Sequence, residues 1–169
     1  MSSLTGTSVA APSYAGVRFL FDSNIMLRLS QPSHPHHASA RNAVTVLRGK
    51  ASLLTVPQNL IEFYAVATRP STSNGGLGLS PAAAHGLLST FETLYPPLPD
   101  NAAIFANWKR LILTYGVSGK PTHDARLVAA MKAHGLTHLL TFNLADFRRF
   151  EADEGITVVD PASVSQSNV

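Results

Sequence analysis

The stretch Phe19-Leu20-Phe21-Asp22-Ser23-Asn24 decides the fold that we expect for this chain. Three apolar residues run directly into a carboxylate and an amide, which is the pattern of a buried parallel strand that ends in polar groups. In open α/β sheets, ligands bind at the carboxyl ends of such strands. Asp22 is therefore the first candidate for a functional side chain.

The composition is that of a globular protein of one domain. The chain has 169 residues, of which 45% are hydrophobic and 14% are charged, and a chain of this size can bury a continuous core. Cysteine is absent, which excludes disulfides, thiolate metal sites and a cysteine nucleophile, and which fits a reducing, cytoplasmic setting. No apolar run is long enough to predict a membrane span. The formal net charge of +3 mildly favours a polyanionic partner.

Strand and helix patterns alternate along the rest of the chain, which predicts an α/β domain with a mainly parallel sheet. Further strands are expected at 52–56, 137–141 and 156–159, and helices at 24–29, 38–48, 58–68, 82–94, 101–115, 123–134 and, as a short turn, 144–150.

Three segments are expected to lie outside this regular pattern. Residues 1–16 are small and polar and are interpreted as a flexible N-terminal segment, and residues 162–169 as a flexible C-terminal tail. The domain itself then covers 17–161. Within it, the breaker-rich stretch 69–79 is expected to form a long mobile loop.

Four carboxylates fall where predicted strands end or where helices follow strands. Their convergence at one sheet edge is costly unless a positive group neutralises them, and oxygen-rich sites of this kind suit Mg²⁺ or Mn²⁺. Such ions activate water and stabilise the oxygens of phosphoryl transfer. The candidates are Asp22, Glu62, Asp124 and Asp146.

Each candidate also has a purely structural interpretation. Asp22 and Asp124 stand where a carboxylate can cap a helix or favour its dipole. Glu62 can be paired or exposed on its helix, and Asp146 can be an ordinary turn residue. Because no single spacing is diagnostic, the functional interpretation rests on the combination.

Four segments carry that combination. They are Phe21-Asp22-Ser23-Asn24, Ile61-Glu62-Phe63-Tyr64, Thr122-His123-Asp124-Ala125-Arg126-Leu127-Val128-Ala129-Ala130 and Leu140-Thr141-Phe142-Asn143-Leu144-Ala145-Asp146-Phe147. Together they resemble the PIN domain family, especially the VapC-type toxins of bacterial toxin–antitoxin modules. The resemblance covers about 17–161, in the family's order.

The resemblance implies a three-layer α/β/α sandwich and a metal-dependent endoribonuclease that cuts single-stranded RNA, with Mg²⁺ or Mn²⁺ as cofactor. It also implies a cognate antitoxin protein that covers the acidic site, and a homodimer. The family's metal-binding positions map onto Asp22, Glu62 and Asp124. The fourth polar position maps onto Asn143, an amide where many members carry a carboxylate, with Asp146 close behind it.

Supporting and RNA-binding residues follow from the same comparison. Asn24 and Thr141 match positions that hydrogen-bond the acidic cluster, and Arg69 and Arg126 are candidate phosphate contacts. Arg28, Lys120 and Arg148 are further candidates, and Tyr64 or Phe142 is a candidate for base stacking. For most of these cations a solvated surface is the simpler interpretation. His123 neighbours Asp124, which suggests an acid–base role, but successive helix residues point in different directions, so an exposed or indirect role is expected. The histidines at 34, 36 and 37 are interpreted as a polar surface loop, with transition-metal binding as the alternative.

Two rival functions belong to other classes. A PIN-fold module that binds RNA or protein without cutting gains support from Asn143, while the three intact carboxylates oppose it. A phosphatase of the haloacid dehalogenase type also begins with an apolar strand before an aspartate. That family requires a second aspartate where this chain has Asn24, and a later acidic pair that is absent.

Overall fold

A four-stranded parallel sheet lies at the centre of the computed structural model, which describes residues 12–169. Its order is β2-β1-β3-β4, and every neighbouring pair is parallel. The carboxyl ends of all four strands therefore lie at one edge, and β1 is the point where the strand order changes direction. The strands are β1 (Arg18–Phe21), β2 (Ser52–Leu54), β3 (His138–Leu140) and β4 (Thr157–Val159).

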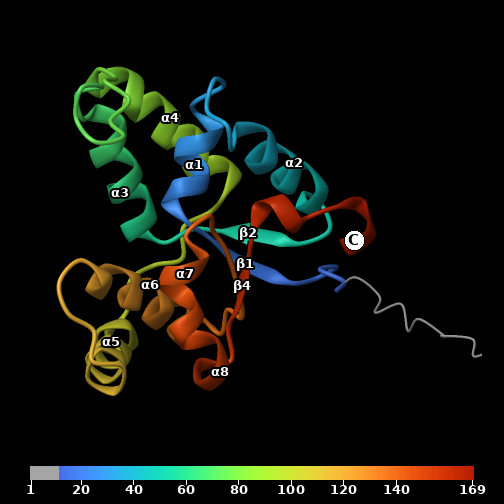
Figure 1. Cartoon of the computed structure of the whole chain (residues 1–169), viewed down its shortest axis with the longest axis vertical. Coiled ribbons are helices and arrows are strands. Elements are labelled where there is room, and N and C mark those ends of the chain that lie inside the picture. Colours follow the sequence, from blue (N-terminus) through green and yellow to red (C-terminus); the bar gives the residue numbers. More distant parts are fainter. Residues whose placement is uncertain (1–11) are drawn as a thin grey trace, which may run out of the picture.

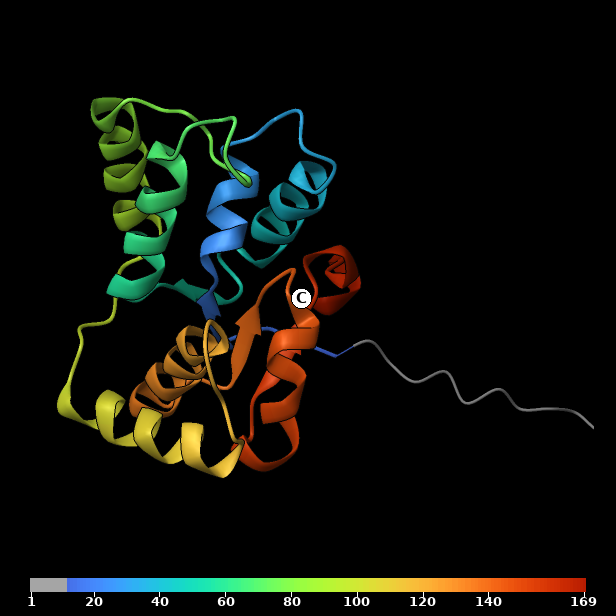
Figure 2. The same cartoon turned by 60° about the vertical axis from the view of Figure 1, so that its left-hand side comes forward.

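Helices cover both faces of the sheet, as Figures 1 and 2 show. One layer contains α1 (Ser23–Leu29), α2 (His37–Leu47), α3 (Pro57–Thr68) and α4 (Pro81–Leu94). The other contains α5 (Ala102–Thr114), α6 (Pro121–His134), α7 (Leu144–Phe147), the 3₁₀ turn Arg148–Phe150 and α8 (Glu151–Glu154). The predicted α/β class with a parallel sheet is confirmed.

Strand β1 explains how two cores form around one sheet. Phe19 and Phe21 belong to the core cluster shared with α1 to α4, whereas Leu20 belongs to the cluster shared with α5 and α6. All three side chains are fully buried. Alternate residues of a strand point to opposite faces, so an apolar run without polar interruptions is what a strand buried on both faces needs.

The stretch 69–79 leaves α3 and folds back onto it. The amides of Leu77 and Leu79 donate to the carbonyls of Val66 (3.2 Å) and Ala67 (2.9 Å). A Cβ atom at Gly76 would lie 2.3 Å from the Pro70 carbonyl oxygen, so the close approach of backbone to backbone requires glycine there. The loop is thus tied to the end of α3.

The segment that follows β4 packs along α2. Val164 is 3% exposed, and its carbonyl accepts a hydrogen bond from Asn42 of α2 (2.9 Å). The Asn168 carbonyl accepts one from the amide of Tyr14 (2.6 Å). Residues 162–169, expected from the sequence as a tail, therefore contact the domain; residues 1–11 of the expected N-terminal segment lie outside the described part.

Two helical segments differ by more than one residue from the sequence-based expectation. Helix α6 begins at Pro121, two residues early, because a proline in the first turn loses no helical hydrogen bond. The expected turn at 144–150 continues into α8, which stops at Gly155 in the left-handed conformation. Both changes matter for charged groups described below.

Candidate functional site

Asp22 lies at the centre of the carboxyl edge, directly after β1, and is 4% exposed. Although it precedes α1, its side chain makes no capping hydrogen bond. Instead, Oδ2 accepts from Thr141 Oγ1 (2.7 Å) and Asn24 Nδ2 (2.9 Å), and Oδ1 accepts from Ser23 Oγ (3.2 Å). The purely structural interpretation as a helix cap does not describe this carboxylate.

Thr141 joins the ends of β1 and β3. Besides donating to Asp22, its hydroxyl oxygen accepts from Asn24 Nδ2 (2.9 Å) and from the amide of Asn143 (3.0 Å). Asn24 Oδ1 in turn accepts from the amide of Phe142 (3.3 Å). Asn24 and Thr141 thus hold one orientation of the Asp22 carboxylate, in the arrangement that the supporting role requires.

Glu62 reaches Asp22 through a serine. Pro57 begins α3 after β2, and Glu62 follows in the second turn. Ser23 Oγ lies 3.1 Å from Glu62 Oε2 and 3.2 Å from Asp22 Oδ1. Because a hydroxyl has one proton, it serves one of these carboxylates at a time.

Gln58 fixes the other oxygen of Glu62. Its amide nitrogen donates to Glu62 Oε1 (2.8 Å) and to the His123 carbonyl (2.9 Å), and its oxygen accepts from Arg126 (3.0 Å). Arg126 also forms an ion pair with Asp100 (3.0 Å). Asp100, Arg126 and Gln58 thereby connect α6 to Glu62.

Asp124 lies in the first turn of α6 and is half-buried, while Asn143 and Asp146 are exposed at the start of α7. No hydrogen bond among these three side chains occurs in the described part of the chain. Asp124 and Asp146 are coupled to the site electrostatically, because the charges of Asp146 and Glu62 both act on Asp124, whereas Asn143 is linked to it through the hydrogen bond of its backbone amide to Thr141.

The electrostatics of the site are those of crowded carboxylates. Burial, and then the charge of Glu62, raise the pKa of Asp22 to about 6, against the hydrogen bonds of Thr141 and Ser23. Burial, followed by the charges of Asp146 and Glu62, raises the pKa of Asp124 to about 6. Lys120 and His123 only partly oppose this. Within residues 12–169, no ion pair reaches Asp22, Glu62, Asp124 or Asp146.

The donor set fits a hard divalent cation in its chemistry, since every candidate ligand atom is a carboxylate or amide oxygen. A cation would also oppose the repulsion that raises the two pKa values. Among the described residues, however, no three acidic or histidine side chains converge closely enough to hold an ion as they stand. The carboxylates are arranged as neighbours, not as a closed ligand cage.

Two further groups from the sequence analysis have defined contacts, and Arg69 lies at the far end of α3, seven residues after Glu62. Arg69 is exposed at the end of α3, where it donates to the Asn74 carbonyl (3.1 Å). His36 stacks on Phe142 with ring centroids 4.7 Å apart, next to the end of β3. Sequence reasoning missed Ser23 and Gln58. The available signal for Gln58 was its position four residues before Glu62, which places both on one helix face.

The chain thus has a parallel sheet between two helical layers, and carboxylates lie at the carboxyl edge of that sheet. The chain has the PIN-domain fold, as solved structures of toxin–antitoxin proteins demonstrate. No family model matches the sequence, and no curated protein matches it in sequence.

Three of these structures illustrate the similarity. VapBC2 from Rickettsia felis, bound to a DNA fragment from its promoter, has 14% identity and a TM-score of 0.62 over 85% of this chain and 98% of that chain. FitAcB from Neisseria gonorrhoeae has 15% identity and a TM-score of 0.61 over 86% and 99%. VapC20 from Mycobacterium tuberculosis, a toxin that cleaves the sarcin–ricin loop, has 14% identity and a TM-score of 0.57 over 78% and 94%.

These matches confirm the resemblance at the level of the fold. The predicted three-layer sandwich is confirmed with it. Between residues 12 and 169, no helix is long and apolar enough to cross a membrane.

Proposed function

We propose that this protein is a metal-dependent endoribonuclease that hydrolyses phosphodiester bonds of single-stranded RNA, and that it is the toxin of a toxin–antitoxin pair. One observation carries the proposal. A buried carboxylate, Asp22, lies beside Glu62 at the carboxyl edge of a PIN-fold sheet without an internal cation to neutralise it. The fold of VapC20, whose described activity is RNA cleavage, supports the same class of reaction.

Mg²⁺ or Mn²⁺ is the proposed cofactor. Asp22, Glu62 and Asp124 would hold it, with Asn143 or Asp146 completing the set. When bound, such an ion lowers the pKa of a water molecule and neutralises charge on the oxygens of the phosphate.

The chain's own residues have separate tasks in this proposal. Thr141 and Asn24 keep the Asp22 carboxylate in one orientation, and Gln58 does the same for Glu62. Asp146 is exposed, and its charge acts on Asp124, which supports a role for it, or for Asp22, in orienting the attacking water. Arg69 and the other exposed cations around the site would attract the RNA backbone.

A groove between α3 and α4 suits a protein partner. It has a volume of about 450 Å³ and is lined mainly by apolar residues, including Leu60, Ile61, Tyr64 and Leu88. Ile61 is 68% exposed, although it directly precedes Glu62. The similar structures are toxin–antitoxin complexes, so we infer that an antitoxin segment covers this groove and the acidic site beside it. We also propose that the protein forms a homodimer through exposed apolar surface.

Cleavage of labelled single-stranded RNAs tests the proposal. Purified wild-type protein is incubated with a panel of RNAs in Mg²⁺, in Mn²⁺ and in EDTA. The Asp22→Asn variant runs alongside, with Asp153→Asn as the matched control because Asp153 is an exposed carboxylate on α8, outside the acidic site. Cleavage should need the metal, fall at least about 100-fold in Asp22→Asn and persist in Asp153→Asn.

A folded, antitoxin-free wild-type protein that cuts no RNA in the panel would contradict the nuclease. That result would favour the alternative function, a PIN-fold module that binds RNA or protein without cutting. Equal cleavage by wild-type protein and Asp22→Asn would mean that the protein is a nuclease but that Asp22 does not take part in cleavage.

A further inference from the structure

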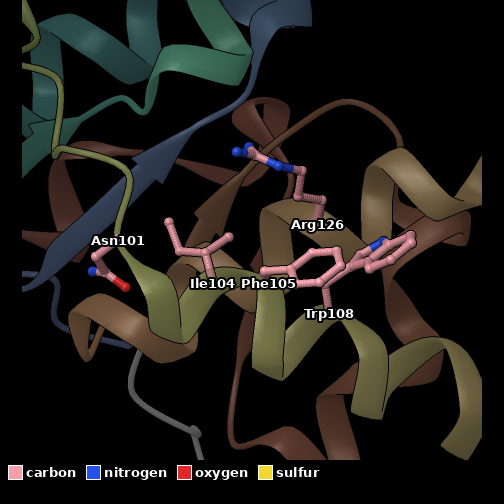
Figure 3. A pocket seen from close by; sticks show the side chains of 5 residues that line it. All are labelled: Asn101, Ile104, Phe105, Trp108 and Arg126. Carbon is pink, nitrogen blue, oxygen red and sulfur yellow. The ribbon is translucent and has the colours of Figure 1, made fainter.

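A second concave site lies on the other helical layer, between α5 and α6. It is a pocket of about 250 Å³ lined by Asn101, Ile104, Phe105, Trp108 and Arg126. Figure 3 shows Phe105 and Trp108 side by side along α5, with Arg126 reaching over them from α6. Drug-sized ligands occupy pockets of about 300–1,000 Å³, so this one has the size for a single ring system.

The wall of the pocket is a flat aromatic surface. The rings of Phe105 and Trp108 are stacked, with centroids 5.6 Å apart and an interplanar angle of 20°. They stand three residues apart, on one face of the helix. Phe105 remains 60% exposed, so its ring is accessible to a ligand.

Two cations lie beside this wall, and one of them, Arg126, also pairs with Asp100 (3.0 Å). Lys109 Nζ lies 5.1 Å from the Phe105 ring centroid, and Arg126 lines the pocket with only two of its five N–H donors in side-chain hydrogen bonds. The lining contains no carboxylate. The groove between α3 and α4 has the opposite charge pattern, because its lining residues include Glu92 and no cation.

Two hydrogen-bond connections join the pocket to the acidic site. Arg126 donates to Gln58, which donates to Glu62. Trp108 Nε1 donates to the Thr122 carbonyl (2.9 Å), two residues before Asp124. The second bond also fixes the indole ring, so the aromatic wall is rigid before any ligand binds.

We propose that the Phe105–Trp108 pocket is a base-stacking subsite, which takes one nucleobase of the single-stranded RNA whose scissile phosphate lies at Asp22. This rests on the proposed function for the identity of the RNA. Every base has a π-face, and aromatic side chains with nearby cations are the common platform for unpaired nucleotides. The base stacks against Phe105, and the adjoining phosphate meets Lys109 and the remaining donors of Arg126.

The only tryptophan of the chain is Trp108, so tryptophan emission reports on this pocket directly. The Asp22→Asn variant, which leaves RNA intact under the proposal, is titrated with a short single-stranded RNA and with an abasic oligonucleotide of the same length. Labelled-RNA anisotropy measures total binding in parallel. We expect saturable quenching by the RNA and little quenching by the abasic strand, which carries the same phosphates without bases.

Variants of Phe105 test the stacking itself. Phe105→Ala should weaken RNA binding about 5- to 100-fold, the range for the loss of one stacked base. Phe105→Tyr should retain binding, and Phe105→Leu should not restore it, because leucine keeps apolar bulk without a π-face. Leu113→Ala is the matched control, since Leu113 is 82% exposed on the same helix but outside the pocket.

Three outcomes would overturn the subsite. They are RNA binding without any change of emission, equal binding by Phe105→Ala, and an emission change that follows protein concentration alone, which would make the surface an interface between copies. Failure of the nuclease is distinguishable: RNA that quenches Trp108 without being cut by wild-type protein supports the subsite alone. Metal-dependent cleavage without quenching of Trp108 emission would contradict the stacking subsite and still support the nuclease.

Discussion

Glu154 and Asp22 are both almost completely buried, at 5% and 4% exposure, but only Glu154 is surrounded by cations. Arg110 donates to both of its oxygens (2.8 and 2.7 Å), Tyr115 donates to one (3.1 Å), and the Lys132 ammonium lies 3.6 Å away. The Arg110 hydrogen bond is the main reason that the pKa of Glu154 is held below its ordinary value.

Asp22 receives three hydrogen bonds as well, but all come from neutral groups, and the nearest charge is that of Glu62. Its pKa is consequently raised. The chain therefore neutralises one buried carboxylate, Glu154 of α8, with its own arginine and lysine. At the sheet edge, no ion pair neutralises Asp22 within residues 12–169; under the proposed function a bound cation supplies the neutralising charge.

The largest effect should come from supplying that cation. A ligand that binds only the folded state at about 100 to 1,000 times its Kd stabilises it by roughly 3–4 kcal/mol. Mg²⁺ or Mn²⁺ should therefore raise the Tm of the wild-type protein by about 5–15 °C for a chain of this size. Differential scanning fluorimetry measures the shift, with NaCl at equal ionic strength as control. A wild-type shift no larger than that of Asp22→Asn would refute the difference between the two carboxylates.

The second effect is a pH dependence in EDTA. Because the pKa of Asp22 is raised from 3.8 to about 6, the folded state binds more protons than the unfolded state between about pH 4 and 6. The free energy of unfolding should therefore fall by about 2–3 kcal/mol as pH rises through this window, at about 1.4 kcal/mol per pKa unit. Asp124 adds a smaller fall because water partly screens it.

Glu154 acts with the opposite sign. Its lowered pKa contributes stability that is complete above about pH 4.5 and is lost as pH falls below that value. Urea denaturation from pH 3 to 8 should thus show a maximum near pH 4 in EDTA, where the two opposite slopes cancel. In Asp22→Asn most of the decline above this maximum should vanish, and an unchanged decline would count against the raised pKa.

The third effect is on stability alone. Glu154→Gln weakens the charge-assisted hydrogen bonds from Arg110 and removes the ion pair with Lys132, and should lower the free energy of unfolding by about 2 kcal/mol. Arg110 and Lys132 are partly exposed, so water limits the penalty for their lost partner. Asp153→Asn, on the same short helix, should change stability by less than about 0.5 kcal/mol. Equal values for both variants in urea denaturation would mean that the Glu154 cluster contributes little.

The smallest effect concerns the neutral donors of Asp22. Thr141→Val keeps the shape of a fully buried side chain but removes the hydroxyl that contacts Asp22, Asn24 and the Asn143 amide. It should cost about 1 kcal/mol in EDTA. Thr45→Val is the control, because the Thr45 hydroxyl bonds only a carbonyl on the exposed side of α2. If both variants unfold alike, the hydroxyl at Thr141 is dispensable for holding Asp22.

Much of the fold was predictable, because the information is local. The apolar run before Asp22 indicates a strand buried on both faces, and Pro57 and Ser80-Pro81 mark the starts of α3 and α4. The neighbourhood of Asp22 and Glu62 was predictable for a related reason. One residue directly follows a central strand and the other lies early in the helix after its neighbour.

The remaining features depend on partners that are distant in sequence. Glu154 lies in an acidic run that is typical of a solvated surface, and its burial depends on Arg110, 44 residues earlier. Asp100 directly precedes Asn101, the cap of α5, but it pairs with Arg126, 26 residues later. The spacing of Gln58 and Glu62 is a local signal, but the contact of Gln58 with Arg126, 68 residues later, is not.

The hydrogen bond from Thr141 to Asp22 spans 119 residues of sequence, which has a consequence for synthesis on the ribosome. Strand β1 emerges early, but its partner β3 and the loop that orients Asp22 arrive last. At about 5–20 residues per second, that interval lasts on the order of ten seconds. Throughout it the nascent chain has no assembled acidic site, so the edge of the sheet becomes competent only once nearly the whole domain has been made.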